Sequence, residues 1–238
     1  MRLLSSVGGL QKIWLKIVQV YETTKNQSNS LDGHLTVCYN HLKKRRNGKD
    51  GAHMTLPGTT IEVAEFERGV SLAMFEGIFA TGGITLSQVA IMTGLEPHAI
   101  QNWVKRGFVS SPQKRTYSKN QFARIVIINM LRESLQLDKI CSLIGYINGS
   151  LSDESDDLIG DAELYHMYVD MVAGMGKLAT DRTMINEAAR NAAESYVEPV
   201  TGARARLVKV LEAMAYAHYA AIAKSYAEMT IREIEQNM

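Results

Sequence analysis

Residues 85–107 read TLSQVAIMTGLEPHAIQNWVKRG, and this run predicts two short helices joined by a tight turn. Thr85 can cap the first helix through its side-chain oxygen. Gly94 ends that helix, because glycine adopts left-handed backbone without a steric penalty. Pro97 suits the first position of the second helix, where its missing N–H costs nothing, and Gly107 ends it. Two helices arranged in this way are typical of a helix-turn-helix unit.

The second predicted helix has one apolar face and one polar face. Its apolar stripe consists of Ile100, Trp103 and Val104, and its polar face carries His98, Gln101 and Asn102. In helix-turn-helix proteins the second helix enters the major groove of DNA, where Gln and Asn can pair with adenine edges. These three polar residues are therefore the candidate base contacts. An ordinary helical hairpin with a hydrated outer face has the same pattern.

A basic, turn-rich loop follows the second helix and ends in an aromatic residue. Residues 110–117 read SSPQKRTY, and Ser118 with Gln121 then forms the spacing of a capping box. A strongly apolar helix is predicted over residues 122–131. Asp138 can cap a further helix with apolar residues at helical spacing up to Ile147.

The order of these pieces over residues 84–148 resembles the MerR-type winged helix-turn-helix. The matching parts are the two helices, the step Gly107-Phe108-Val109, the wing ending Arg115-Thr116-Tyr117-Ser118, the long apolar helix and the short helix after it. More narrowly, the run resembles a family of uncharacterised bacterial proteins with a MerR-like DNA-binding fold, described only as a domain of unknown function.

The resemblance implies a DNA-binding transcription regulator that contacts double-stranded DNA as a homodimer. The second helix would read bases through His98, Gln101 and Asn102. The residues expected to contact phosphates are Lys105, Arg106, Lys114, Arg115, Thr116 and Tyr117. Two copies are expected because specific DNA binding by one such unit normally requires half-sites about one helical turn apart.

The sequence departs from the MerR pattern in the second helix. That family usually carries an Arg-Tyr-Tyr run, and the corresponding residues here are Gln101, Asn102 and Trp103. This departure favours an alternative function, in which the winged helix binds a protein partner. A third hypothesis assigns a small-molecule effector site to residues 160–238.

The charge of the chain is unevenly distributed. The 238 residues have a net charge of +1, yet residues 85–140 carry eight Lys and Arg against three acids, and residues 150–176 carry seven acids and no base. A basic segment beside an acidic one suggests an anionic partner for the basic segment. Two hydrated faces of opposite sign are the alternative interpretation.

Composition and periodicity predict a mainly α-helical protein. Residues 1–53 are expected to be a peripheral, poorly ordered extension, because a more regular sequence begins at Met54. A natural upstream extension and a non-native start are the two interpretations of this segment. Residues 54–150 should contain a helix over 60–80 followed by the winged helix-turn-helix. Residues 151–238 should contain an acidic loop and an α-helical dimerisation or effector region, with a last helix over 203–236.

Several classes of protein are not expected. No run of 18 apolar residues occurs, so the sequence predicts no transmembrane helix and no membrane partner. The two cysteines fit a reducing compartment, and a cytoplasmic location is expected. The chain lacks a phosphate-binding glycine loop, G-x-S-x-G, H-E-x-x-H and C-x-x-C. We therefore expect no enzymatic activity, no cofactor and no metal site.

Overall fold

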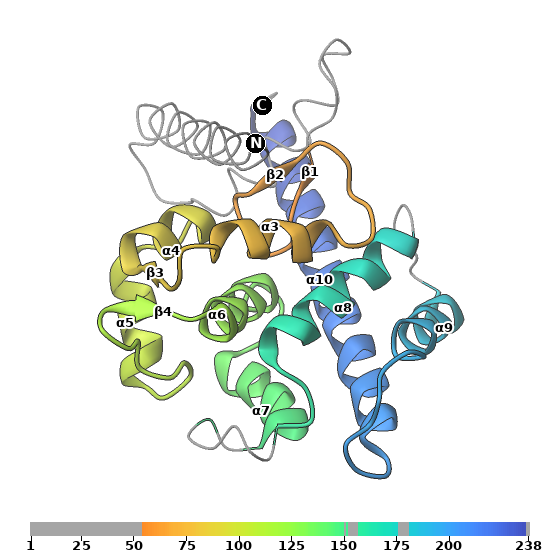
Figure 1. The fold of residues 1–238 in the computed structure, drawn as a ribbon. Helices are drawn as coiled ribbons and strands as arrows, with labels where there is room; N and C mark the ends of the chain where they lie inside the picture. Colours follow the sequence, from red (N-terminus) through yellow and green to blue (C-terminus); the bar gives the residue numbers. More distant parts are fainter. Residues whose placement is uncertain (1–53, 150, 152–156, 176–180, 237–238) are drawn as a thin grey trace, which may run out of the picture.

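The computed structural model describes residues 54–149, 151, 157–175 and 181–236, and the predictions made for residues 1–53 lie outside these ranges. The described part is mainly helical, as predicted (Figure 1). Its helices are α3 (Val70–Ile78), α4 (Leu86–Thr93), α5 (Pro97–Lys105), α6 (Lys119–Leu131), α7 (Leu137–Asn148), α8 (Asp161–Met175), α9 (Arg182–Ala192) and α10 (Ala203–Gln236). Two antiparallel sheets of two strands each pair β1 (Met54–Thr55) with β2 (Glu62–Val63) and β3 (Ile84–Thr85) with β4 (Thr116–Tyr117).

Helix α6 forms the centre of the molecule. Nine of its thirteen residues are buried, because the helix is apolar on nearly all sides. It packs against α4, α7, α8 and α10. Figure 1 shows α4, α5, β3 and β4 on one side of α6 and α9 and α10 on the other. One hydrophobic cluster includes buried residues from both sides of the boundary predicted near residue 150.

Of three helix caps predicted from local sequence, two are confirmed and the third is wrong. Thr85 with Gln88, and Ser118 with Gln121, form reciprocal capping boxes at the starts of α4 and α6. Each box satisfies backbone N–H groups that have no partner within the helix. Asp138 does not cap α7, which begins one residue earlier. It lies instead in the first turn, where its charge favours the helix dipole.

The helix predicted over residues 60–80 is wrong in its first half. Residues 54–63 form the β1–β2 hairpin, and α3 begins only after Gly69, whose φ is 83°. The hairpin binds the end of α4: the Thr60 N–H donates to the Met92 carbonyl at 2.8 Å, and its hydroxyl donates to the Ile91 carbonyl at 2.7 Å. Carbonyls at a helix end require such partners, so a long-range contact overrides the local helical pattern.

A buried amide fixes the same hairpin to the central helix. Asn129 of α6 donates through Nδ2 to the carbonyls of Gly58 and Thr93, both at 2.9 Å. From the other side, the Tyr165 hydroxyl of α8 donates to the Pro57 carbonyl at 2.8 Å. The end of α4, and with it the start of the turn toward α5, is therefore held on a rigid support.

Candidate nucleic-acid interface

The turn between α4 and α5 has the predicted length and chemistry. Gly94 takes the left-handed conformation with φ 68°, and Leu95 turns into the core, with 5% of its surface exposed. Pro97 occupies the start of α5 as expected. Glu96 precedes it but makes no side-chain capping bond, so the backbone geometry of Gly94 and Pro97 sets the turn.

Helix α5 presents its predicted polar face to solvent. Ile100 and Trp103 are buried. On the opposite side, the exposed residues are His98, Gln101, Asn102 and Lys105. Their spacing of three and four residues places them on one face of the helix. The structure therefore brings the three predicted base contacts and one predicted phosphate contact together.

Residues 108–117 connect α5 to α6 and form a small projecting loop, which we call the wing. Val109 is buried at its base, and β4 pairs with β3 at its returning end. At the tip, the Thr116 N–H donates to the Gln113 carbonyl at 2.8 Å, which closes a four-residue turn. The two central residues of this turn are Lys114 and Arg115, and both are exposed.

The backbone of the tip is left-handed at both central positions. Lys114 has φ 47° and Arg115 has φ 65°, and among the described residues they are the non-glycine positions with positive φ. Two successive left-handed residues define a hairpin turn that prefers Asn-Gly. For a residue with a Cβ, the left-handed conformation is about 1–2 kcal/mol less favourable than the right-handed one. Strain of this kind points to a function of the residues that carry it.

Thr116 and Tyr117 are both expected to contact phosphates, but their side chains make contacts within the chain. The Thr116 hydroxyl donates to the Gln113 carbonyl at 2.9 Å and thus supports the turn. Tyr117 packs in the core with 3% of its surface exposed, and burial raises the pKa of its hydroxyl. This burial disagrees with a phosphate contact by Tyr117. The local sequence could not separate the two roles, because strand residues alternate between faces.

Arg106 is exposed but partly engaged within the chain. Its guanidinium lies 4.4 Å from the centre of the Phe108 ring, and its Nη2 lies 3.9 Å from an Asp138 carboxylate oxygen. Both contacts are of the kind that contributes little at an exposed site. Of the predicted cationic phosphate contacts, Arg106 is thus the one with an ion-pair partner among the described residues.

The remaining cations of residues 85–140 fall into two groups. Three pair with acids of the same chain: Lys119 with Glu76, Arg124 with Asp161, and Arg132 with Glu133. The hydrogen bond from Lys119 and its positive charge lower the pKa of Glu76. The cations that form no ion pair with another described residue are Lys105, Lys114, Arg115 and Lys139. Three of these four are predicted phosphate contacts.

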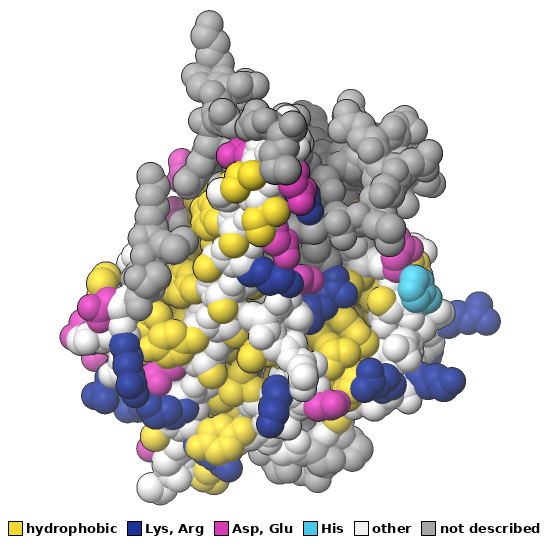
Figure 2. Space-filling model, turned by 180° about the vertical axis from the view of Figure 1, so that it is seen from behind, with side chains coloured by type: hydrophobic (Ala, Val, Ile, Leu, Met, Phe, Trp, Pro, Cys, Tyr) yellow, Lys and Arg dark blue, Asp and Glu magenta, His cyan; other side chains and the backbone are white. Residues whose placement is uncertain are grey.

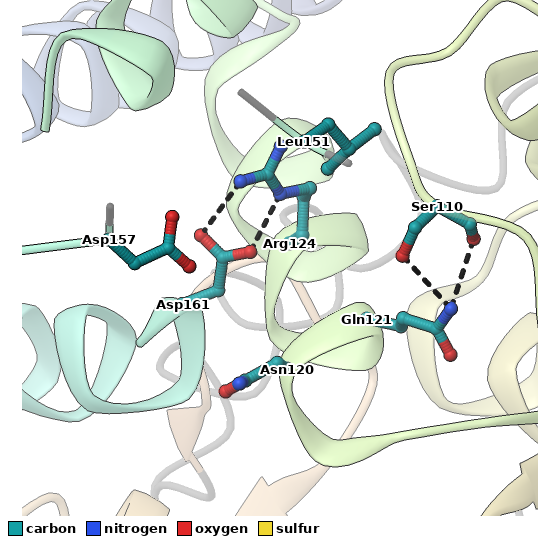
Figure 3. A pocket seen from close by; sticks show the side chains of 7 residues that line it. All are labelled: Ser110, Asn120, Gln121, Arg124, Leu151, Asp157 and Asp161. Atoms are coloured by element: carbon teal, nitrogen blue, oxygen red, sulfur yellow. Dashed lines mark hydrogen bonds and ion pairs between the residues drawn. The ribbon is translucent and has the colours of Figure 1, made fainter. Parts of the chain in front are cut away.

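A polar pocket lies beneath the wing (Figure 3). The pocket is lined by Ser110, Asn120, Gln121, Arg124, Leu151, Asp157 and Asp161. Arg124 and Asp161 satisfy each other, with 2.6 Å between Nε and Oδ2, and Asn148 donates to the same carboxylate at 3.1 Å. The lining therefore joins α6 to α8 rather than presenting a free charge. Sequence patterns could not reveal it, because its partners are far apart in the chain.

The part of the chain that the structure describes contains neither a metal-binding cluster nor a helix that could span a membrane. No group of three or more His, Cys, Asp or Glu side chains there is placed to hold a metal ion. None of the helices there has both the length and the apolar content needed to cross a membrane.

One protein family is similar to part of this chain. The model of a domain of unknown function (DUF1836) matches residues 84–168. No curated protein and no solved structure matches. The matched span runs from β3 into α8, and so contains the α4–α5 pair, the wing, and both Arg124 and Asp161.

Proposed function

We propose that this chain is a cytoplasmic DNA-binding transcription regulator, rather than an enzyme, and that it acts as a dimer. In this proposal α4 and α5 form a helix-turn-helix and residues 108–117 form its wing. The face of α5 with His98, Gln101 and Asn102 contacts bases, and the wing contacts the phosphate backbone. The MerR-like order of the elements supports this interpretation.

The observation that carries the proposal is the strained cationic tip of the wing. Lys114 and Arg115 are adjacent, exposed and left-handed, and neither forms an ion pair with a described residue. A stabilising sequence for this turn would be Asn-Gly, so the two cations are present at a cost in stability. Contact with phosphates gives a reason for that cost, because each neutralised phosphate releases a counterion.

The proposed dimer requires a surface, and the second half of α10 offers one. The buried residues of this 34-residue helix end at Tyr219. One face of the helix, from the last turn of its buried part onward, carries an exposed stripe consisting of Tyr216, Ala220, Ala223, Ala227, Thr230 and Ile234. The intervals between these residues alternate between four and three, as in a helix–helix seam. Figure 2 shows this side of the molecule, with apolar side chains along its upper centre.

The exposed stripe of α10 matches a second copy of itself. In an antiparallel pair, Tyr216 of one copy faces Ile234 of the other, Ala220 faces Thr230, and Ala223 faces Ala227. The large side chains then lie at the ends and the small ones at the centre, where the helices can approach closely. Lys224, which follows Ala223 in the chain, is held by Glu133 at 3.7 Å and Glu228 at 3.8 Å. Such a self-complementary contact is what a two-fold dimer requires.

The experiment that tests the proposal compares two double variants of the full chain in binding random-sequence duplex DNA. Lys114→Ala/Arg115→Ala should weaken binding and reduce the slope of log K against log salt by about two. Arg182→Ala/Arg190→Ala removes the same charge from exposed positions on α9, across α6 from the wing, and should change neither. Equal effects of the two variants would contradict a specific role of the wing.

A further inference from the structure

The wing is fastened at both of its ends by one side chain, that of Gln121 on α6. A carboxamide can donate through its nitrogen and accept through its oxygen at the same time. Gln121 uses both groups (Figure 3 shows the bonds to Ser110). Its Oε1 accepts from the Ser118 N–H at 2.8 Å, where the chain returns from the wing.

The nitrogen of the same amide holds the outgoing end of the wing. Gln121 Nε2 donates to the Ser110 carbonyl at 3.1 Å, to the Ser110 hydroxyl at 3.0 Å and to the Ser111 carbonyl at 2.9 Å. These acceptors precede the strained tip, and Ser118 follows it. One amide therefore joins the two ends of the loop, in addition to the Thr116–Gln113 bonds at its tip and the β3–β4 pairing.

We infer that Gln121 is a positioning residue that keeps the wing closed and thereby presents Lys114 and Arg115. It touches neither cation, so its effect passes through the backbone of the loop. A loop whose two ends are fixed has fewer conformations available, and the strained tip persists only where its surroundings hold it. This inference deepens the proposed function, on which its DNA-binding arm rests.

The helix cap and the wing contact can be separated by one substitution. In Gln121→Glu the carboxylate still accepts from the Ser118 N–H, because Glu serves this position of a capping box as well as Gln. It has no N–H to donate, and it places a negative charge against the carbonyls of Ser110 and Ser111. The start of α6 should therefore remain, and the outgoing end of the wing should be released.

The chain contains a matched control in the other capping box. Gln88 occupies the same position in α4, and its Oε1 accepts from the Thr85 N–H at 2.8 Å. Among the described residues, its side chain forms hydrogen bonds with Thr85 alone. Gln88→Glu thus adds the same charge to the same type of cap without releasing the wing. Gln121→Met and Gln88→Met form a second, uncharged pair that gives a readout if the carboxylate at position 121 disturbs folding.

The experiment measures trypsin cleavage after Lys114 and Arg115, and DNA binding, in the full-length chain. Gln121→Glu should raise the cleavage rate at these two sites by about tenfold, as expected when a hydrogen bond of ordinary strength no longer opposes local opening. Gln88→Glu should leave the rate unchanged. Binding to duplex DNA should weaken about tenfold in Gln121→Glu relative to Gln88→Glu, with a shallower salt dependence.

Each outcome decides one part of the inference. Equal cleavage rates in both pairs of variants would overturn the closing role of Gln121. Faster cleavage with unchanged DNA affinity would overturn its positioning role. If the unmodified chain binds no DNA at low salt, the proposed function fails, and the cleavage rates alone decide whether Gln121 closes the wing.

Discussion

Arg124 of α6 and Asp161 of α8 form an ion pair that is almost completely buried, with 2.6 Å between Nε and Oδ2 and side chains that are 12% and 10% exposed. Asn148 adds a third partner by donating to Asp161. The pair lies where the DNA-binding unit proposed above meets the C-terminal helices. Removing one member leaves the other charged and buried without its partner.

Substitution at this pair should therefore destabilise the whole fold. We expect Arg124→Ala to lower the free energy of unfolding by about 3–5 kcal/mol. Urea denaturation followed by circular dichroism measures this change. As a control, Lys119→Ala removes one member of a surface pair with Glu76, whose side chains are 37% and 63% exposed, and its effect should stay within about 1 kcal/mol. Equal effects of the two substitutions would contradict this account of the pair.

The features that could be predicted from sequence are those whose partners lie close together in the chain. The capping boxes of Thr85 and Ser118 use a residue three positions away. The polar face of α5 follows from helical periodicity alone. The last helix, predicted over residues 203–236, is confirmed as α10.

The features that could not be predicted depend on contacts between distant residues. Arg124 and Asp161 are 37 positions apart, and no periodic pattern connects them. Residues 60–69 have a helical pattern of apolar residues, yet Thr60 binds the end of α4 instead. The positive φ angles of the wing tip also had no signal, because Lys and Arg are not residues that mark such turns.

The strain at the wing tip predicts that a substitution that relieves it raises the stability of the fold and lowers the affinity for DNA. Lys114→Asn/Arg115→Gly gives the turn the residues that its backbone prefers. We expect the free energy of unfolding to rise by about 1 kcal/mol and DNA affinity to fall. Thermal melts and fluorescence anisotropy with labelled duplex DNA measure the two quantities. Unchanged DNA affinity in this variant would refute the functional interpretation of the strain.

The exposed stripe of α10 predicts how the dimer can be dissociated. Ala223→Glu places a charge at the centre of the proposed pair, and we expect the dimer dissociation constant to rise by about a hundredfold or more. Sedimentation equilibrium measures this constant. Ala205→Glu makes the same change at an exposed position of α10 outside the stripe, and should leave the dimer intact.

Two other results would reject the α10 dimer. The first is an unmodified chain that is monomeric at micromolar concentration. The second is a dimer whose dissociation constant Ala223→Glu leaves unchanged. A chain that dimerises only after residues 1–53 are removed would assign the stripe to that segment instead of to a second copy.

Two partly buried histidines predict that the fold weakens in acid. Burial lowers the pKa of His166 and of His218 to about 4. His166 accepts or donates through Nδ1 with the Ser71 hydroxyl at 3.0 Å, and His218 does so with the Tyr168 hydroxyl at 2.7 Å. In an unfolded chain a histidine has a pKa near 6.5. Between these two pKa values the unfolded state binds more protons than the folded state. The free energy of unfolding therefore decreases as the pH falls.

The stabilisation from the two neutral histidines should thus be complete above pH 6.5 and decline as the pH falls toward about 4. Urea denaturation at intervals between pH 7 and pH 4 measures the slope. His166→Gln/His218→Gln should be less stable at pH 7 but depend less on pH within this interval. The same slope in the double variant and the unmodified chain would show that other groups cause the acid sensitivity.

The central claim is that the wing and α5 together bind duplex DNA. The most direct measurement is selection of bound sequences from a random pool of duplexes by the full chain, followed by affinities at increasing salt. We predict enrichment of a palindrome, a steep decrease of affinity with salt, and weaker binding by Lys114→Ala/Arg115→Ala. No binding at low salt would contradict the claim and would favour the alternative in which the same surface binds a protein partner.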